Sequence, residues 1–125
     1  MSISITNTTK GKLPRLPFAK IAEAVLGKEY DCSLVIVSPR KSRSLNNFYR
    51  EKDKPTNILS FPLDKNQGEI FLDLETCKKD APNFDRSYSN FIGFLFIHGL
   101  FHLKGLDHGA KMEKQEQKIR RLFKI

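Results

Sequence analysis

The sequence predicts a single small α+β domain over residues 1–125, in which one mixed four-stranded sheet packs against about four helices. A chain of 125 residues that is 39% hydrophobic is long enough for one core and too short for two domains of ordinary size. Four short segments have the apolar pattern of strands, and four others have apolar residues at helical spacing. Their order, β-α-β-α-β-β-α-α, is typical of an α+β fold.

The first half of the chain is expected to alternate strands with helices. Isoleucines alternate with polar residues at the start, which predicts a strand, and Pro17 and Gly27 bracket a segment with helical spacing. A short β-branched strand ends at Pro39, and a basic segment with apolar residues on one face follows as a second helix that runs into a basic turn before Pro55. These elements are expected at residues 2–7, 18–27, 33–39 and 40–54.

The second half is expected to form a hairpin and two helices. Two apolar strands flank a polar turn at residues 64–67. The next helix, capped by Asp85, Ser87 or Ser89, is apolar nearly all round and should be the central buried helix of the fold. A last helical segment closes the domain. These elements are expected at residues 56–63, 68–76, 89–104 and 111–125.

The net charge of +8 favours a polyanionic partner, because lysine and arginine gain affinity by releasing counterions from phosphates. The excess is concentrated in residues 40–54 and 111–125. For the C-terminal segment we favour an ordinary solvated helix face. The first segment is more suggestive, because it is expected near the histidines described below.

Several classes of protein are disfavoured. The longest uncharged apolar run, residues 91–101, is shorter than the about 20 residues needed to cross a bilayer. The N-terminus lacks the apolar region of a signal peptide, so a cytoplasmic location is expected. Cys32 and Cys77 are isolated and are expected to be free thiols in a reducing compartment.

All three histidines fall within one short stretch, HGLFHLKGLDH, from His98 to His108. On a helix, His98 and His102 project from the same face one turn apart, and Gly105 can end that helix so that His108 swings in as a third ligand. Three neutral imidazoles suit Zn²⁺, with nickel or another transition metal possible, and leave the open position typical of catalytic zinc. The alternative for each histidine is a hydrogen-bonded core residue.

The same letters overlay the zinc-peptidase pattern H-E-x-x-H-x-x-G-x-x-H, in which the glutamate is the general base. Here Gly99 occupies that position. Without a carboxylate there, a peptidase would need a base from elsewhere in the fold.

The motif also resembles the signature H-G-x-L-H-L-x-G-y-D-H of the YbeY-type bacterial rRNA-maturation endoribonucleases, with Phe101 for leucine and Leu106 for tyrosine. A second family block, L-N-x-x-Y-R followed by K-P-T-N-V-L-S-F-P, appears as LNNFYREKDKPTNILSFP over residues 45–62. A third, G-D-I, appears at Gly68 with Glu69 for aspartate. These blocks lie within residues 45–108, a span of about half of the chain, and on them the sequence is identified as a member of that family.

The resemblance implies a zinc-dependent endoribonuclease, a hydrolase of phosphodiester bonds that is specific for single-stranded RNA. It implies a role in rRNA maturation, including 16S rRNA 3′ end processing, and in ribosome quality control. His98, His102 and His108 would hold one zinc ion per chain, and Arg50 would be important for activity. Expected partners are single-stranded RNA or rRNA and the ribosome or ribosomal proteins, with no membrane and no DNA.

The residues around the motif suggest further roles. A guanidinium can hold two phosphoryl oxygens at once, which is the catalytic role expected of Arg50, although a surface salt bridge with Glu51 or Asp53 is the alternative. Phosphate contacts need charge and reach more than fixed geometry. Candidate substrate-binding residues are Lys52, Lys54, Asn57 and Ser60.

Phe48, Tyr49 and Phe61 could stack bases, but core packing is the expected fate of the phenylalanines.

Three hypotheses for the function stay open: a metal-dependent endoribonuclease, a metallopeptidase-like hydrolase, and a non-catalytic ribosome- or RNA-binding module with a structural metal.

Overall fold

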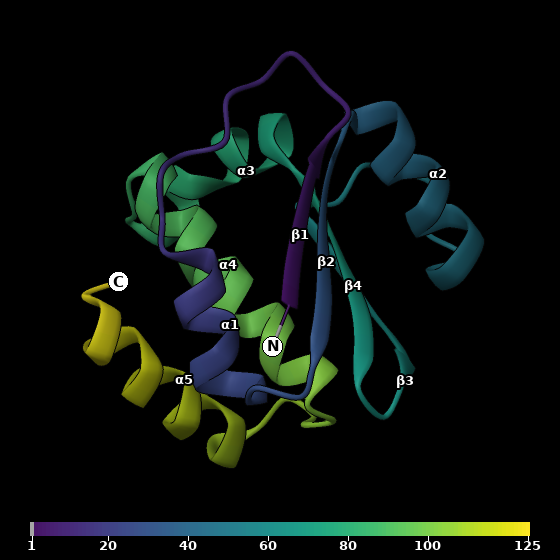
Figure 1. The fold of residues 1–125 in the computed structure, drawn as a ribbon. Coiled ribbons are helices and arrows are strands. Elements are labelled where there is room, and N and C mark those ends of the chain that lie inside the picture. Colours follow the sequence, from purple (N-terminus) through teal and green to yellow (C-terminus); the bar gives the residue numbers. More distant parts are fainter. Residues whose placement is uncertain (1) are drawn as a thin grey trace.

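The computed structural model describes residues 2–125 and contains one four-stranded sheet with helices on both faces (Figure 1). The strands, in the spatial order β1-β2-β4-β3, are β1 (Ser2–Asn7), β2 (Asp31–Val37), β4 (Gln67–Asp73) and β3 (Ile58–Asp64). The helices are α1 (Phe18–Leu26), α2 (Pro39–Arg50), α3 (Leu74–Asp80), α4 (Tyr88–Leu103) and α5 (Ala110–Phe123), with a 3₁₀ turn at Ala81–Phe84.

The sheet is mixed, as predicted. β1 and β4 each pair with β2 in parallel, whereas β3 and β4 form the expected antiparallel hairpin. Figure 1 shows α1, α3, α4 and α5 on one side of the sheet and α2 alone on the other. The α+β fold class is therefore confirmed, and β3 is an edge strand whose two faces meet different helices.

Helix α4 is the central helix of the fold, as its apolar sequence predicts. Most of its residues are buried, and Phe91, Phe96 and Leu100 are fully so. Of the three predicted capping residues, Ser87 is the one that caps, because its side chain accepts a hydrogen bond from the backbone N–H of Asn90 at 3.2 Å. The chain therefore carries its histidine motif on an element that cannot shift without disturbing the core.

The prediction that a strand continues to residue 76 is wrong. β4 ends at Asp73, whose carboxylate accepts hydrogen bonds from the backbone N–H of Thr76 at 3.0 Å and from its hydroxyl at 2.7 Å. This cap starts α3, a short helix that the sequence analysis did not anticipate, and Leu74 and Cys77 bury one side of it. The capping pattern lay inside an apolar run, so the segment looked like continued strand.

The C-terminal helix is not simply a solvated face. Its lysines are exposed, but Glu116 and Arg120 are buried with Met112 on the side that faces α4. Cys32 and Cys77 are free thiols as predicted, and burial raises the pKa of Cys32 to about 11. No helix within residues 2–125 combines the length and the apolar character needed to span a bilayer.

Candidate metal centre

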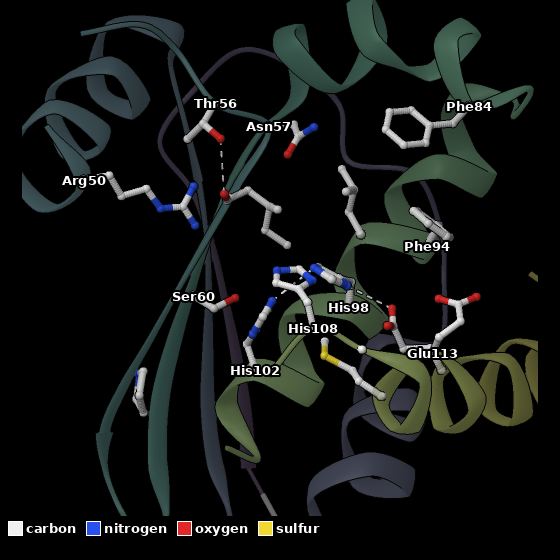
Figure 2. A pocket seen from close by; sticks show the side chains of 16 residues that line it. Arg50, Thr56, Asn57, Ser60, Phe84, Phe94, His98, His102, His108 and Glu113 are labelled. Atoms are coloured by element: carbon white, nitrogen blue, oxygen red, sulfur yellow. Dashed lines mark hydrogen bonds and ion pairs between the residues drawn. The ribbon is translucent and has the colours of Figure 1, made fainter. Parts of the chain in front are cut away.

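The three histidines converge, as their spacing predicts. His98 and His102 project from the last turns of α4, and His108 returns from the loop that follows (Figure 2). Their ring centroids form a triangle with sides of 4.6, 4.7 and 4.9 Å, and their ligand atoms all lie within 4.8 Å of one another. The structure thus brings together the three residues proposed as metal ligands.

The spacing of the ring nitrogens fits a transition metal. Two ligands at a Zn–N distance of about 2.0–2.1 Å in tetrahedral geometry lie about 3.3 Å apart, and the Nε2 atoms of His98 and His102 are 3.1 Å apart. Within residues 2–125, the metal-ligating side chains that meet here are these three histidines, so protein atoms would fill three positions of a tetrahedral shell. His108 is exposed, which leaves the cluster accessible from solvent.

The turn that brings His108 back is a Schellman motif. The N–H of Leu106 donates to the carbonyl of Phe101 at 3.1 Å, and the N–H of Gly105 donates to that of His102 at 3.0 Å. Gly105 has a φ of +96°, a backbone conformation that glycine adopts without a Cβ clash. The expected role of Gly105 as helix stop is confirmed.

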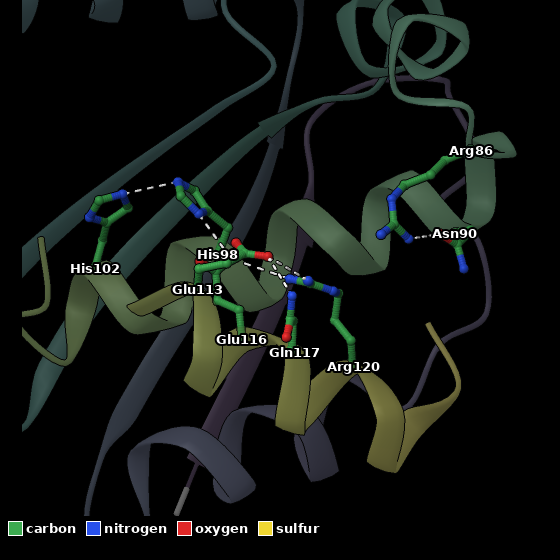
Figure 3. Close-up of polar contacts among 8 residues, drawn as sticks. All are labelled: Arg86, Asn90, His98, His102, Glu113, Glu116, Gln117 and Arg120. Carbon is green, nitrogen blue, oxygen red and sulfur yellow. Dashed lines mark hydrogen bonds and ion pairs between the residues drawn. The ribbon is translucent and has the colours of Figure 1, made fainter. Parts of the chain in front are cut away.

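Glu116 holds one of the imidazoles from α5, and sequence analysis did not identify it. Its Oε1 lies 3.0 Å from Nδ1 of His98, and the residue is only 3% exposed (Figure 3). An ionised carboxylate accepts from an Nδ1–H, which leaves the lone pair of Nε2 directed at the other two rings. This is the arrangement that fixes the tautomer and orientation of a metal-ligating histidine.

Arg120 compensates the buried Glu116 carboxylate. Its guanidinium lies 3.8 Å from Glu116 Oε1 and 3.0 Å from Glu113 Oε1, and its Cζ sits 5.2 Å from the ring centroid of Phe94. Four-residue spacing puts Glu116 and Arg120 on the same side of α5 as Met112, so a charged pair lies on the stripe that faces the core. Charged residues at core-facing positions of a helix were the signal in the sequence that could have identified Glu116.

The surroundings favour a neutral His102. Burial lowers the pKa of His102, and the positive charge that His98 and His108 would carry lowers it further. Only the neutral imidazole offers a nitrogen lone pair to a metal. His102 is therefore held in the form that a ligand requires.

The histidines lie in the wall of a cavity of about 740 Å³. Arg50 reaches toward it from α2 past β3, while Phe84, Phe94 and Glu113 lie on the opposite side of the histidines (Figure 2). The predicted substrate-binding residues divide. Asn57 and Ser60 line the cavity, whereas Lys52 and Lys54 do not. The side-chain amide of Asn57 donates a hydrogen bond to the carboxylate of Asp80 at 3.1 Å.

Arg50 does not form the surface salt bridge with Glu51 or Asp53 that was the alternative from the sequence. Within residues 2–125 it makes no ion pair, and Asp53 is engaged by Arg43 at 2.8 and 3.1 Å. The hydrogen bonds and charge of Arg43 hold the pKa of Asp53 below its usual value. The guanidinium of Arg50 is thus available to an anion in the cavity.

Gly99 shows why the peptidase pattern does not extend to this chain. It is buried where α4 crosses the sheet, and a Cβ there would lie 2.8 Å from Oγ of Ser60 and 3.0 Å from Cδ1 of Ile58. A glutamate in this position would have to enter the helix–sheet interface. The fold excludes a general base at the position that peptidases use.

Comparison with known proteins gives one consistent result. The family model described as Endoribonuclease YbeY matches residues 4–124. Curated proteins named Endoribonuclease YbeY are similar to this chain: that of Nautilia profundicola is 38% identical, covering 74% of this chain and 72% of the relative, and that of Phytoplasma mali is 33% identical, covering 95% and 83%.

The relative from Alkaliphilus metalliredigens is 36% identical over 74% of this chain and 66% of its own length. Among solved structures, the solution structure of TM1509 from Thermotoga maritima matches with a TM-score of 0.66 and 27% identity, covering 94% of this chain and 85% of that one. The similarity thus extends from sequence to fold over nearly the whole chain.

Proposed function

This chain belongs to the Endoribonuclease YbeY family, and on that premise we propose that it is a zinc-dependent, single-strand-specific endoribonuclease. Its substrates would be rRNA precursors, with processing at the 3′ end of 16S rRNA and ribosome quality control as its tasks. It would act in the cytoplasm with the ribosome or ribosomal proteins as partners. The observation that carries the proposal is the triangle of imidazoles in the wall of an open cavity that a free guanidinium also lines.

Each residue has a part that follows from its position. His98, His102 and His108 would hold the metal, which when bound supplies a Lewis acid for a phosphoryl oxygen and lowers the pKa of water. Arg50 would bind two non-bridging oxygens of the phosphate through paired hydrogen bonds and stabilise the charge that they gather in the transition state. Glu116 would keep the ring of His98 oriented throughout.

The test is metal analysis of the purified protein beside cleavage of a labelled single-stranded RNA. We expect zinc to copurify, a chelator to abolish cleavage and added zinc to restore it. His102→Ala should lose both the metal and the activity, because two imidazoles bind zinc far more weakly than three.

The outcomes separate the hypotheses. RNA that is bound in a salt-sensitive way but never cut, with zinc present, would support a non-catalytic module and overturn the proposal. Cleavage that survives a combined His98→Ala and His102→Ala substitution would also overturn it, since the cavity would then lack two of its three ligands.

A further inference from the structure

Four aromatic rings form a continuous chain on the face of the sheet that carries α2. Ring centroids are 4.8 Å apart for Phe48 and Tyr49, 4.6 Å for Tyr49 and Phe61, and 5.7 Å for Phe61 and Phe71. Phe61 and Phe71 are partly buried against the sheet, whereas Tyr49 is 57% and Phe48 78% exposed. The expectation that Phe48 packs in the core is therefore wrong.

The exposed rings and the cavity lie on opposite faces of β3. Side chains alternate along a strand, so on β3 Ser60 lines the cavity while the neighbouring Phe61 packs against Tyr49 on the other face. On α2, Tyr49 belongs to the aromatic chain and the next residue, Arg50, lines the cavity. A ligand that touches both regions needs to pass only the edge of β3.

The charge around the rings indicates what kind of ligand fits. The segment that carries the rings, residues 40–54, also carries exposed cations: Arg40, Lys41, Lys52 and Lys54. Its two acidic residues are Glu51 and Asp53, and Asp53 is already paired with Arg43. Exposed aromatic rings set among cations are the combination by which proteins bind single-stranded nucleic acid, since bases stack on the rings while cations meet the phosphates. The core of a protein–protein interface, by contrast, is depleted of lysine.

We propose that Phe48 and Tyr49 form a base-stacking platform that holds unpaired bases of an RNA strand whose backbone passes the edge of β3 into the cavity. This inference rests on the proposed function and adds the surface that selects single strands. Bases of an A-form duplex are stacked on one another and cannot lie on a protein ring, so the platform would accept only unpaired segments. Every base has a π-face, so recognition would tolerate many sequences.

The experiment measures RNA affinity in a chelator, so that the strand is bound but not cut. The variants are Phe48→Ala, Tyr49→Ala and their combination, with Leu122→Ala as matched control, because Leu122 is an exposed apolar residue (67%) on α5. Stacking contributes about 1–3 kcal/mol per base, so each platform variant should bind a single-stranded oligonucleotide about 5–150-fold more weakly. The control should bind as the wild type does.

A second readout tests stacking itself. An oligonucleotide with abasic sites should bind wild-type protein weakly, whereas the double platform variant should bind the normal and abasic strands alike. With zinc restored, the double variant should show a raised KM and a nearly unchanged kcat, because the platform binds substrate outside the reacting atoms. Metal content should match the wild type, and the loss of the Tyr49–Phe61 contact should lower the melting temperature only slightly, because both substituted rings are more than half exposed.

Failure here can be told apart from failure of the proposed function. Unchanged affinity of the folded double variant for RNA would overturn the platform while RNA cleavage still stood. If the double variant lost binding to ribosomal proteins but kept its RNA affinity, the rings would be a protein-docking surface and the inference would again be wrong. A wild-type protein that binds RNA on the platform but never cuts it would instead overturn the nuclease proposal.

Discussion

The two faces of β3 are built on different physical principles. On the cavity side, His98 and His102 extend from a helix whose buried residues are all apolar, and a buried carboxylate orients His98. On the other side, α2 buries only Ser42 and Asn46, and it is fastened to the chain by hydrogen bonds: Ser42 to Asp73 at 2.7 Å, and the Asn46 amide to the carbonyl of Lys54 at 2.9 Å.

That difference matches what each side has to bind. A metal needs ligands fixed to within a fraction of an ångström, which a packed helix provides. A flexible RNA strand needs charge, reach and exposed rings, which a helix with a solvated outer surface provides. Arg50 is the residue that connects the two, because it belongs to α2 but lines the cavity.

The largest expected difference between the two sides is in stability. Phe96 on α4 is fully buried and meets Phe18 edge to face at 5.0 Å, so Phe96→Ala should lower the free energy of unfolding by about 3–5 kcal/mol. Phe48→Ala removes the same atoms from a side chain that is 78% exposed, and it should change stability by at most about 0.5 kcal/mol. Urea denaturation of the pair measures both values, and equal losses would contradict the contrast between the faces.

The next largest effect is expected from Arg50→Ala. Loss of a group that stabilises the charge of the transition state typically lowers kcat by about 10²–10³-fold, while zinc content and melting temperature should not change. Arg50→Lys keeps the charge but not the paired hydrogen bonds, so it should recover only a small part of the activity. Steady-state cleavage kinetics measure this effect. A normal kcat for the alanine variant would contradict a catalytic role for Arg50.

Glu116→Ala should lower the affinity for the metal and should change the affinity for RNA much less. Removing the partner of a metal-ligating histidine usually weakens metal binding about 10–100-fold, and zinc competition against a chelator measures it. Glu116→Gln should lose less, because its amide oxygen still accepts a hydrogen bond from Nδ1 of His98. Both variants must be compared as folded apo-proteins, since Arg120 loses its buried partner; equal zinc affinities in all three proteins would contradict the role.

The parts of the site that were predictable from sequence are local ones. The four-residue spacing of His98 and His102 and the stop at Gly105 depend on a single helix and its cap, so they could be read without knowing the fold. The partnership of Glu116 with His98 joins two helices, and only their packing shows it. The helix α3 was missed for a related reason, because its cap at Asp73 ends an apolar strand whose pattern continues into Leu74.

Lys52 and Lys54 show how a local feature can redirect a prediction. Glu51 ends α2 in the left-handed conformation, with a φ of 58°, and the two lysines that follow do not line the cavity that Arg50 lines. Their nearness in sequence to Arg50 suggested a closer role than the fold gives them. They stay candidates for phosphate contacts farther along the strand.

The smallest expected effect is that of Lys52→Ala combined with Lys54→Ala. Exposed lysines that contact phosphates contribute through counterion release, so the variant should bind RNA several-fold more weakly at low salt and nearly normally at high salt. The slope of log affinity against log salt concentration should fall in magnitude by up to about 1.4, since each contact to a single strand contributes about 0.7. The Phe48 and Tyr49 variants should lose affinity with an unchanged slope, because stacking releases no ions. If instead the lysine variant kept the full slope, Lys52 and Lys54 would lie outside the path of the RNA. Of the residues proposed on that face, only the rings would then contact the strand.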